Sequence, residues 1–182
     1  MENQNLKSLV GNGVCHLTVT NQQFIEESLL SENKGLNSGA FSEVSFVKCR
    51  FEGIEMMCNA FSKCEFQDCI FLKTNLSYAE VHHSKFKTCS FINCDLSDAE
   101  IEENIFDSCV FDNIKLINTD FSKCEFICPQ FKNIPDYYGS VLEDSKITLN
   151  DSRSIMLNAQ FDLCSIVELL CSDPWKDIQG RL

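Results

Sequence analysis

The residues of this sequence best suited to chemistry are its 12 cysteines, because thiolates bind soft metal ions and oxidised pairs form disulfides. Pairs such as Cys64 and Cys69 are too far apart in sequence for a zinc knuckle. Seven of the cysteines fall in a regular series: Cys49, Cys64, Cys69, Cys89, Cys94, Cys109 and Cys124. Whether they bind metal, form disulfides or fill space depends on the elements that position them.

The histidines are the next candidates. His82 and His83 are adjacent to one another and close to Glu80, which makes a weak candidate metal site, and His16 beside Cys15 is no stronger. The sequence contains no Gly-rich phosphate loop, no H-E-x-x-H motif and no nucleophile elbow. We therefore expect a protein that is not an enzyme, with no catalytic residues, no metal site and no cofactor.

Carboxylates also recur at a regular spacing, and in a repeating fold such a series forms a column of negative charge. This column is either a solvated surface or an imitation of the phosphates of duplex DNA. The net charge of −12 argues against direct binding to nucleic acid, which needs a basic surface. The acidic candidates for binding a partner are Glu80, Asp98, Glu100, Glu102, Glu103 and Asp120.

A fivefold period underlies these positions. From residue 36 to residue 131 every fifth residue is large and apolar, at 20 consecutive positions without an insertion. In KFKTCSFINCDLSDAEI, residues 85–101, the series reads Phe86, Phe91, Leu96 and Ile101. A strand has period 2 and a helix period 3.6, so neither template fits.

The fivefold series itself repeats every 20 residues and so divides into four columns. One of these columns is never aromatic, and two are always phenylalanine. Four segments of the short period then make one coil with four sides, in which the large residues point inward and equivalent residues of successive coils stack. The pattern predicts an all-β solenoid, a quadrilateral β-helix of about five coils spaced about 4.8 Å apart. The non-aromatic column is Leu36, Met56, Leu76, Leu96 and Leu116.

The residue two positions before each large one is small, and this position holds the seven cysteines of the series. We expect it to point inward near a corner, where cysteine acts as a small hydrophobic residue. Cysteines five apart then lie on different sides of a coil. Buried, reduced thiols are the favoured interpretation, with metal binding and disulfides as the alternatives. Reduced thiols indicate a reducing compartment, and hence a cytoplasmic location.

The segments NLSYA, DLSDA and TDFSK resemble the A-[DN]-L-x-x unit of the pentapeptide-repeat proteins. This resemblance covers residues 36–131 and implies a right-handed quadrilateral β-helix. It says little about function, because unrelated activities use the same fold.

The two ends depart from the repeat. Residues 1–35 break the period and are expected to form an irregular N-terminal cap or first coil, in which Phe24 and Leu30 begin the core. Residues 132–182 are expected to form a terminal coil followed by a helix, because Met156 and Phe161 return to the fivefold phase after a polar turn region.

The segment DLCSIVELLCSDPW predicts a short C-terminal helix, with Asp162 as its N-cap and Pro174 beyond its end. Burying a large apolar side chain stabilises a protein by about 1.5–3 kcal/mol, so an exposed apolar face is unfavourable. The face therefore covers the rod end or a second subunit. It consists of Leu163, Ile166, Val167 and Leu170.

The C-terminal residues from Asn150 are similar to the end of the Qnr-like quinolone-resistance and topoisomerase-poison-immunity pentapeptide proteins. In that family this segment pairs two subunits tail to tail, so the resemblance implies a homodimer through the C-terminal helix. The family's central proline is replaced by Cys164, and no long loop interrupts the coils. The matching residues are Arg153, Ala159, Phe161, Leu163, Leu169 and Leu170.

Two functional hypotheses follow. The first is a DNA mimic that binds a type IIA topoisomerase, DNA gyrase or topoisomerase IV, and modulates or protects it. The alternative is a protein-interaction scaffold or secreted effector with no topoisomerase link. It would use an outward apolar patch that is otherwise covered by the N-terminal segment: Ile70, Leu72, Ile92 and Val110. No signal segment and no run of about 18 apolar residues is present, so no membrane partner is expected.

Overall fold

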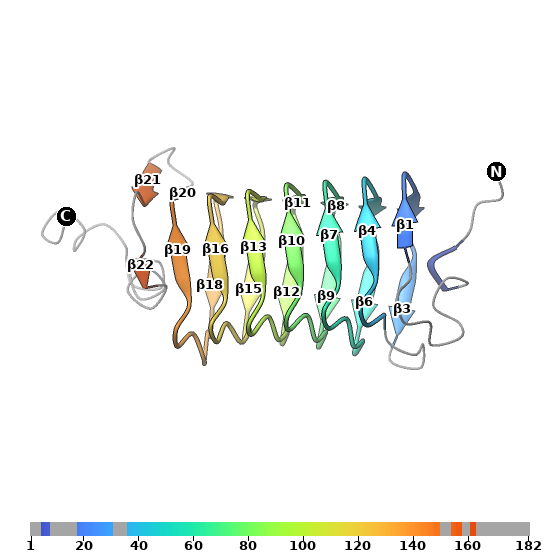
Figure 1. The fold of residues 1–182 in the computed structure, drawn as a ribbon, viewed down its shortest axis with the longest axis horizontal. Coiled ribbons are helices and arrows are strands. Elements are labelled where there is room, and N and C mark those ends of the chain that lie inside the picture. Colours follow the sequence, from blue (N-terminus) through green and yellow to red (C-terminus); the bar gives the residue numbers. More distant parts are fainter. Residues whose placement is uncertain (1–4, 8–17, 31–35, 150–153, 158–160, 163–182) are drawn as a thin grey trace, which may run out of the picture.

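The chain forms a straight rod of stacked four-sided coils (Figure 1). The computed structural model describes residues 5–7, 18–30, 36–149, 154–157 and 161–162. Three sides of every coil are short strands that pair in parallel with the coils before and after, so that Phe86, for example, lies between Phe66 and Phe106. The predicted all-β quadrilateral solenoid is confirmed.

Three sheets line three sides of the rod, and we number the sides in the order in which the chain meets them. Side 1 contains β1 Thr18–Thr20, β4 Ala40–Ser42, β7 Ala60–Ser62, β10 Glu80–His82, β13 Glu100–Glu102, β16 Asp120–Ser122, β19 Val141–Glu143 and β22 Phe161–Asp162. Side 2 contains β2 Gln23–Ile25, β5 Ser45–Val47, β8 Glu65–Gln67, β11 Lys85–Lys87, β14 Ile105–Asp107, β17 Glu125–Ile127, β20 Ser145–Thr148 and β21 Ser154–Leu157. Side 3 contains β3 Ser28–Leu30, β6 Arg50–Glu52, β9 Ile70–Leu72, β12 Ser90–Ile92, β15 Val110–Asp112 and β18 Gln130–Lys132.

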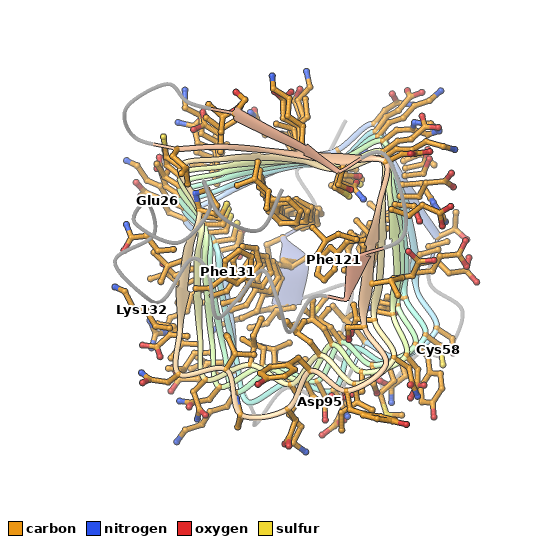
Figure 2. The ribbon with its side chains drawn as sticks, turned by 90° about the vertical axis from the view of Figure 1, so that its left-hand side faces the viewer. Glu26, Cys58, Asp95, Phe121, Phe131 and Lys132 are labelled. Carbon is orange, nitrogen blue, oxygen red and sulfur yellow. The ribbon has the colours of Figure 1, made fainter. Side chains whose placement is uncertain are left out.

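Side 4 has no continuous strand among the described residues. It is held by single parallel bridges that join Glu55, Asn75, Asp95, Lys115 and Asp136 in turn. Figure 2 views the rod from its C-terminal end, with side 4 at the bottom near Asp95, side 1 at the right near Phe121 and side 3 at the left near Phe131. The chain runs counter-clockwise through these sides as it advances toward the viewer, so the solenoid is right-handed.

The large residues of the fivefold series fill the axis of the rod, as Phe121 and Phe131 show in Figure 2. On side 2, Phe46, Phe66, Phe86, Phe106 and Phe126 stack with ring centroids 4.6–5.1 Å apart. A second stack on side 3 runs from Phe51 to Phe131 with centroids 4.8–5.2 Å apart. Nearly parallel rings at the strand spacing bury a large apolar area in each coil.

Each corner is closed by the residue two positions after the inward one, which adopts a left-handed conformation. Lys63, Asp68 and Lys73 have φ of 54°, 54° and 52°, and the same holds around every coil of the central repeat. Asn and Asp tolerate this conformation better than other non-glycine residues do, but lysine, histidine and threonine also occupy it here. The regular corner turns the chain by one side in each segment of the fivefold series.

The first coil is regular on the three sides that carry strands. Strands β1, β2 and β3 continue the three sheets, with Thr18 opposite Ala40. Leu29 is buried with Phe24, whereas Leu30 is only half-buried. Of the two residues expected to begin this coil, Phe24 therefore lies in the core and Leu30 does not. This coil is longer than those of the central repeat, and the extra length shifts the fivefold phase and hid the coil in the sequence.

The N-terminal end of the core is closed by Leu6, which is buried and belongs to the same apolar cluster as Val19, Phe24 and Leu29. Its segment lies beyond β1 at the N-terminal end of the rod (Figure 1). A cap is needed at this end because the terminal coil of a solenoid otherwise exposes its core.

The C-terminal end differs from the expected terminal coil. Strands β19 and β20 add one more parallel turn, with Leu142 and Ile147 buried. The chain then reverses, and β21 and β22 pair antiparallel with β20 and β19. The expectation of a further coil through Met156 and Phe161 is therefore corrected. A fivefold spacing does not encode strand direction, so the sequence pattern could not reveal the reversal.

The side 1 column of the core leaves an apolar cavity of about 30 Å³. Val81 and Ile101 interrupt a column of phenylalanines there, and their smaller volume does not fill the axis. The cavity is too apolar to hold a well-bonded water molecule.

We expect the substitution Val81→Ile to raise the free energy of unfolding by about 0.5–1 kcal/mol, because one added methylene group enters this cavity. Urea unfolding of the purified variant measures the change. The matched substitution Ile101→Val should lower stability by about 0.5–1.5 kcal/mol. A loss of stability in Val81→Ile would mean that the cavity cannot accept the extra group.

Candidate interaction surface

The outward side chains segregate by charge. Within residues 36–131, side 1 carries six carboxylates and two lysines, a net charge of −4 with neutral histidines. Side 4 carries Glu55, Asp95 and Asp98 against Lys115, a net charge of −2. Side 2 has a net charge of −1 and side 3 of zero. Sides 1 and 4 meet at the corner of Cys58 (Figure 2), so most of the negative charge lies on one continuous half of the rod.

The central feature of side 1 is a column of three carboxylates. Glu80 pairs in register with Glu100, and Glu100 with Asp120, so the three lie directly opposite one another on neighbouring strands. Like charges placed opposite in a sheet are destabilising. Among the described residues Glu80 and Glu100 form no ion pair, and both are exposed. The column therefore presents uncompensated negative charge to the solvent.

The neighbouring carboxylates are partly neutralised. Lys123 Nζ lies 2.7 Å from Glu102 Oε1 and 3.6 Å from Glu103 Oε1. The hydrogen bond from Lys123 lowers the pKa of Glu102, and the same contact raises the pKa of Lys123. His83 Nδ1 lies 2.9 Å from Glu103 Oε2, and His82 Nδ1 lies 3.8 Å from Glu102 Oε2. Two of the six predicted acidic residues are thus engaged within the protein.

The corner between sides 1 and 4 adds a further carboxylate and an aromatic ring. Asp98 accepts a hydrogen bond of 3.1 Å from Asn118 Nδ2 at this exposed corner. Tyr78, one coil earlier at the same corner position, is 54% exposed. Neither Tyr78 nor Lys123 is among the residues predicted from the sequence. Both occupy the left-handed corner position, and its outward orientation is the signal that would have identified them.

On side 4, Asp95 is committed to local contacts. Burial by itself would raise the pKa of Asp95, but hydrogen bonds from Ser97 and the nearby Lys115 ammonium outweigh it and lower the pKa. The Ser97 backbone nitrogen lies 3.0 Å from Asp95 Oδ1, and Lys115 Nζ lies 3.4 Å from Oδ2. Among the described residues, the predicted carboxylates without a cationic partner are therefore Glu80, Asp98, Glu100 and Asp120.

The predicted apolar patch is present on side 3, which faces away from side 1. Its members extend from the adjacent strands β9, β12 and β15, and each is half-buried. The part of the N-terminal segment that the structure describes outside the strands, residues 5–7, lies at the end of the rod and does not cover side 3. The patch consists of Ile70, Leu72, Ile92 and Val110.

The seven cysteines of the series are buried and free, as predicted. The structure adds a role that the sequence did not suggest: each thiol donates a weak hydrogen bond to the carbonyl of an inward residue one coil earlier. Cys69 Sγ lies 3.3 Å from Phe46 O, and Cys94 Sγ lies 3.3 Å from Phe71 O. Thr74 and Asn104 occupy the same position in other segments and donate equivalent hydrogen bonds to the carbonyls of inward residues one coil earlier, Phe51 and Val81. The position favours a small side chain with a donor.

Burial raises the pKa of Cys64, Cys94 and Cys124 and so keeps these three thiols protonated. It raises the pKa of Cys94 to about 11 and that of Cys124 to about 12. A thiol reacts through its thiolate, so these side chains are poor nucleophiles and poor metal ligands at neutral pH. Within the described ranges, no three His, Cys, Asp or Glu side chains are arranged to hold a metal ion.

The predicted dimerisation residues Leu163, Ile166, Val167 and Leu170 lie outside the described residues. Among the helices that the structure describes, none is long and apolar enough to cross a membrane.

Comparison with known proteins gives matches to solved structures. No protein-family model matches the chain, and no curated protein matches it. A trypsin-treated variant of QnrB1, a plasmid-mediated fluoroquinolone resistance protein, is 19% identical over 70% of this chain and 71% of its own, with a TM-score of 0.43. Full-length QnrB1 is 14% identical over 70% of this chain and 93% of its own, with a TM-score of 0.25.

The pentapeptide-repeat protein HetL, involved in heterocyst differentiation regulation in the cyanobacterium Nostoc sp., is also similar. It is 8% identical over 76% of this chain and 91% of its own, with a TM-score of 0.22. The fold assignment rests on the strand order and register described above.

Proposed function

We propose that this chain, which has the fold of the pentapeptide-repeat proteins, is a non-enzymatic rod that binds a type IIA topoisomerase through its acidic half. The partner surface would be the basic saddle on which DNA gyrase or topoisomerase IV holds duplex DNA. In this proposal the rod occupies that saddle in place of DNA, and so modulates or protects the enzyme.

The observation that supports the proposal is the uncompensated column of Glu80, Glu100 and Asp120. Three stacked carboxylates with no lysine partner in the described part of the chain cost stability, because like charges lie opposite one another at strand spacing. Elsewhere on the rod, neighbouring coils place opposite charges in contact, as Lys146 does with Glu125. A basic partner would remove the repulsion that the free protein carries.

The linear charge density of the rod is about half that of duplex DNA. Residues 36–131 carry a net charge of −7, and five coils at about 4.8 Å span roughly 24 Å. This gives about one net charge per 3.4 Å, against one per about 1.7 Å for double-stranded DNA. Because most of the rod's charge lies on sides 1 and 4, the density on the acidic half is not diluted over the whole circumference.

The proposed binding is electrostatic and should therefore weaken with salt. Added salt screens exposed charges beyond about 8 Å at physiological ionic strength. Electrostatic complementarity mainly accelerates association, so the association rate should fall more steeply with salt than the dissociation rate rises.

We expect the double charge reversal Glu100→Lys and Asp120→Lys to abolish binding to DNA gyrase. The substitution replaces two members of the free column and reverses the field that meets the basic saddle. Binding is measured by surface plasmon resonance, and its consequence by a supercoiling assay with and without a quinolone. Circular dichroism verifies that the solenoid remains folded.

The matched control is the reversal Glu65→Lys with Asp107→Lys on side 2, which makes the same change in net charge. This control should retain at least half of the binding strength. Equal loss in both variants would indicate a response to net charge alone, and unchanged binding in the side 1 variant would refute the proposed surface.

A further inference from the structure

Side 3 presents an apolar face with no net charge in a protein that is otherwise acidic. Ile70, Leu72, Ile92 and Val110 extend outward from three consecutive strands of one sheet, and no described segment lies across them. Sheets pack face to face at about 10 Å through such side chains. This surface can therefore accept a second sheet of matching chemistry.

The charges around the patch favour a second copy of this chain as that sheet. The whole chain has a net charge of −12, so two copies repel one another through most orientations. Side 3 is the exception, because Arg50 and Lys73 balance Glu52 and Asp112 within residues 36–131. Two copies can approach through side 3 with their acidic halves pointing away from each other.

The order of the outward residues along one coil is self-complementary. Asp68, Ile70, Leu72 and Lys73 follow one another across side 3, with Asp68 and Lys73 at its two corners. A twofold axis parallel to the rod reverses this order in the facing copy. Asp68 then lies opposite Lys73 of the partner subunit, and Ile70 lies opposite Leu72 of the partner subunit.

The outward residues of the preceding coil are also arranged in a self-complementary order. Arg50 and Glu52 flank the inward residue of β6 and form an ion pair of 2.9 Å within one chain. Under the same twofold axis Arg50 lies opposite Glu52 of the partner subunit, so four alternating charges come together. In the next coils Ser90 lies opposite the partner's Ile92. No like charges are brought together on these two outward rows.

An antiparallel arrangement is less favourable, because it forms fewer charge pairs across the patch. Centred on β12, it places Lys73 opposite the partner's Asn113 and Leu72 opposite the partner's Asp112. Burying a carboxylate against an aliphatic side chain costs free energy. The parallel arrangement brings Asp112 to Val110 of the partner subunit instead, at the end of the patch, where water still reaches the carboxylate.

We propose that two copies of this chain associate side by side through side 3, with their rods parallel and related by a twofold axis along the rod. The face is one side of a narrow solenoid, so the buried area falls below the roughly 1,200 Å² of a standard interface, and the dimer is weak and reversible. This contact is independent of the proposed topoisomerase surface, which lies on the opposite half of the rod.

The test is sedimentation velocity of the full chain from 10 µM to 1 mM. The unmodified protein should show a weight-average sedimentation coefficient that rises with concentration. The substitution Leu72→Asp should weaken this association at least about tenfold, because it buries a charge against the partner's Ile70. The control Ile105→Asp, an outward aliphatic residue on side 2, should leave it unchanged.

A charge exchange tests the orientation. Lys73→Asp places two carboxylates opposite one another and should weaken association about fivefold. The double variant Asp68→Lys with Lys73→Asp should restore it to within about twofold, because each charge meets its opposite again only in the parallel arrangement.

Three results would overturn the proposal. The first is a chain that does not self-associate at 1 mM, as expected if another segment or another protein occupies side 3. The second is association that is insensitive to Leu72→Asp, which would indicate contact through the rod ends. The third is a double variant that is no tighter than Lys73→Asp alone.

Discussion

Raising the pH from 8 to 10 is expected to lower the free energy of unfolding by roughly 7 kcal/mol, through the buried thiols. Burial raises the pKa of Cys94 to about 11 and of Cys124 to about 12. The neighbouring thiol of Cys49 lowers the pKa of Cys69, but the neighbouring thiol of Cys89 and burial outweigh this effect and raise the pKa to about 12.

The pKa values of two more buried thiols, Cys49 and Cys89, are raised in the same way. The neighbouring thiol one coil later, together with burial, raises the pKa of Cys49 and of Cys89. The ordinary pKa of the thiol is 9.0. Between that value and the raised values, the unfolded chain has lost these protons while the folded protein keeps them, so stability is full below pH 9 and falls as the pH rises.

Each such thiol contributes a slope of about 1.4 kcal/mol per pH unit above pH 9. Five thiols acting together approach the whole stability of a typical domain, which is about 5–15 kcal/mol. We therefore expect cooperative unfolding near pH 10 to 11. Urea unfolding in the presence of a reductant, at half-unit steps of pH, measures the slope.

The control is the double variant Cys69→Ser with Cys89→Ser, since serine already occupies the equivalent positions at Ser84 and Ser145. Removing two thiols should reduce the alkaline slope by about 2.7 kcal/mol per pH unit, whatever the variant's stability at pH 7. An unchanged slope would assign the alkaline transition to the lysines and tyrosines instead.

The substitution Phe86→Ala is expected to lower the free energy of unfolding by about 3–5 kcal/mol. Phe86 lies at the middle of the side 2 stack, with ring centroids 4.6 Å from Phe66 and 4.9 Å from Phe106. Its removal takes away both stacking contacts and leaves a cavity that the neighbouring coils cannot close, because their strands are fixed in register.

Thermal and urea unfolding of Phe86→Ala measure this loss. Because a solenoid is stabilised by contacts between neighbouring coils, a break at its centre should also divide unfolding into two steps. The control Tyr78→Ala removes an exposed aromatic ring and should change stability by no more than about 0.5 kcal/mol. A loss of under about 1 kcal/mol in Phe86→Ala would show that the coils adjust around the missing ring.

The core could be predicted closely because its pattern is local. Every side of a coil in the central repeat has the same length, so Phe86 and Phe91 reveal by spacing alone that they point inward. The fivefold spacing did not identify the inward residues where the length of a coil changed. Thr18 pairs with Ala40 across a longer coil, and the place of Leu29 in its core was therefore missed.

The candidate interaction surface was predicted less completely. The column of Glu80, Glu100 and Asp120 follows from the longer period, and the structure places these residues in register. The pairing of Glu102 and Glu103 with Lys123 does not follow from it, because a long lysine side chain reaches several neighbours and its choice depends on the corner geometry.

The sequence by itself determined the four-sided coil, the phenylalanine stacks and the burial of the cysteines, because a fixed count of residues per side decides which side chains meet. Only the tertiary structure decided the antiparallel reversal of β21 and β22, the donor role of the thiols and the set of carboxylates left without a cationic partner. These features depend on strand direction and on contacts between coils. A periodic pattern of residue types specifies neither.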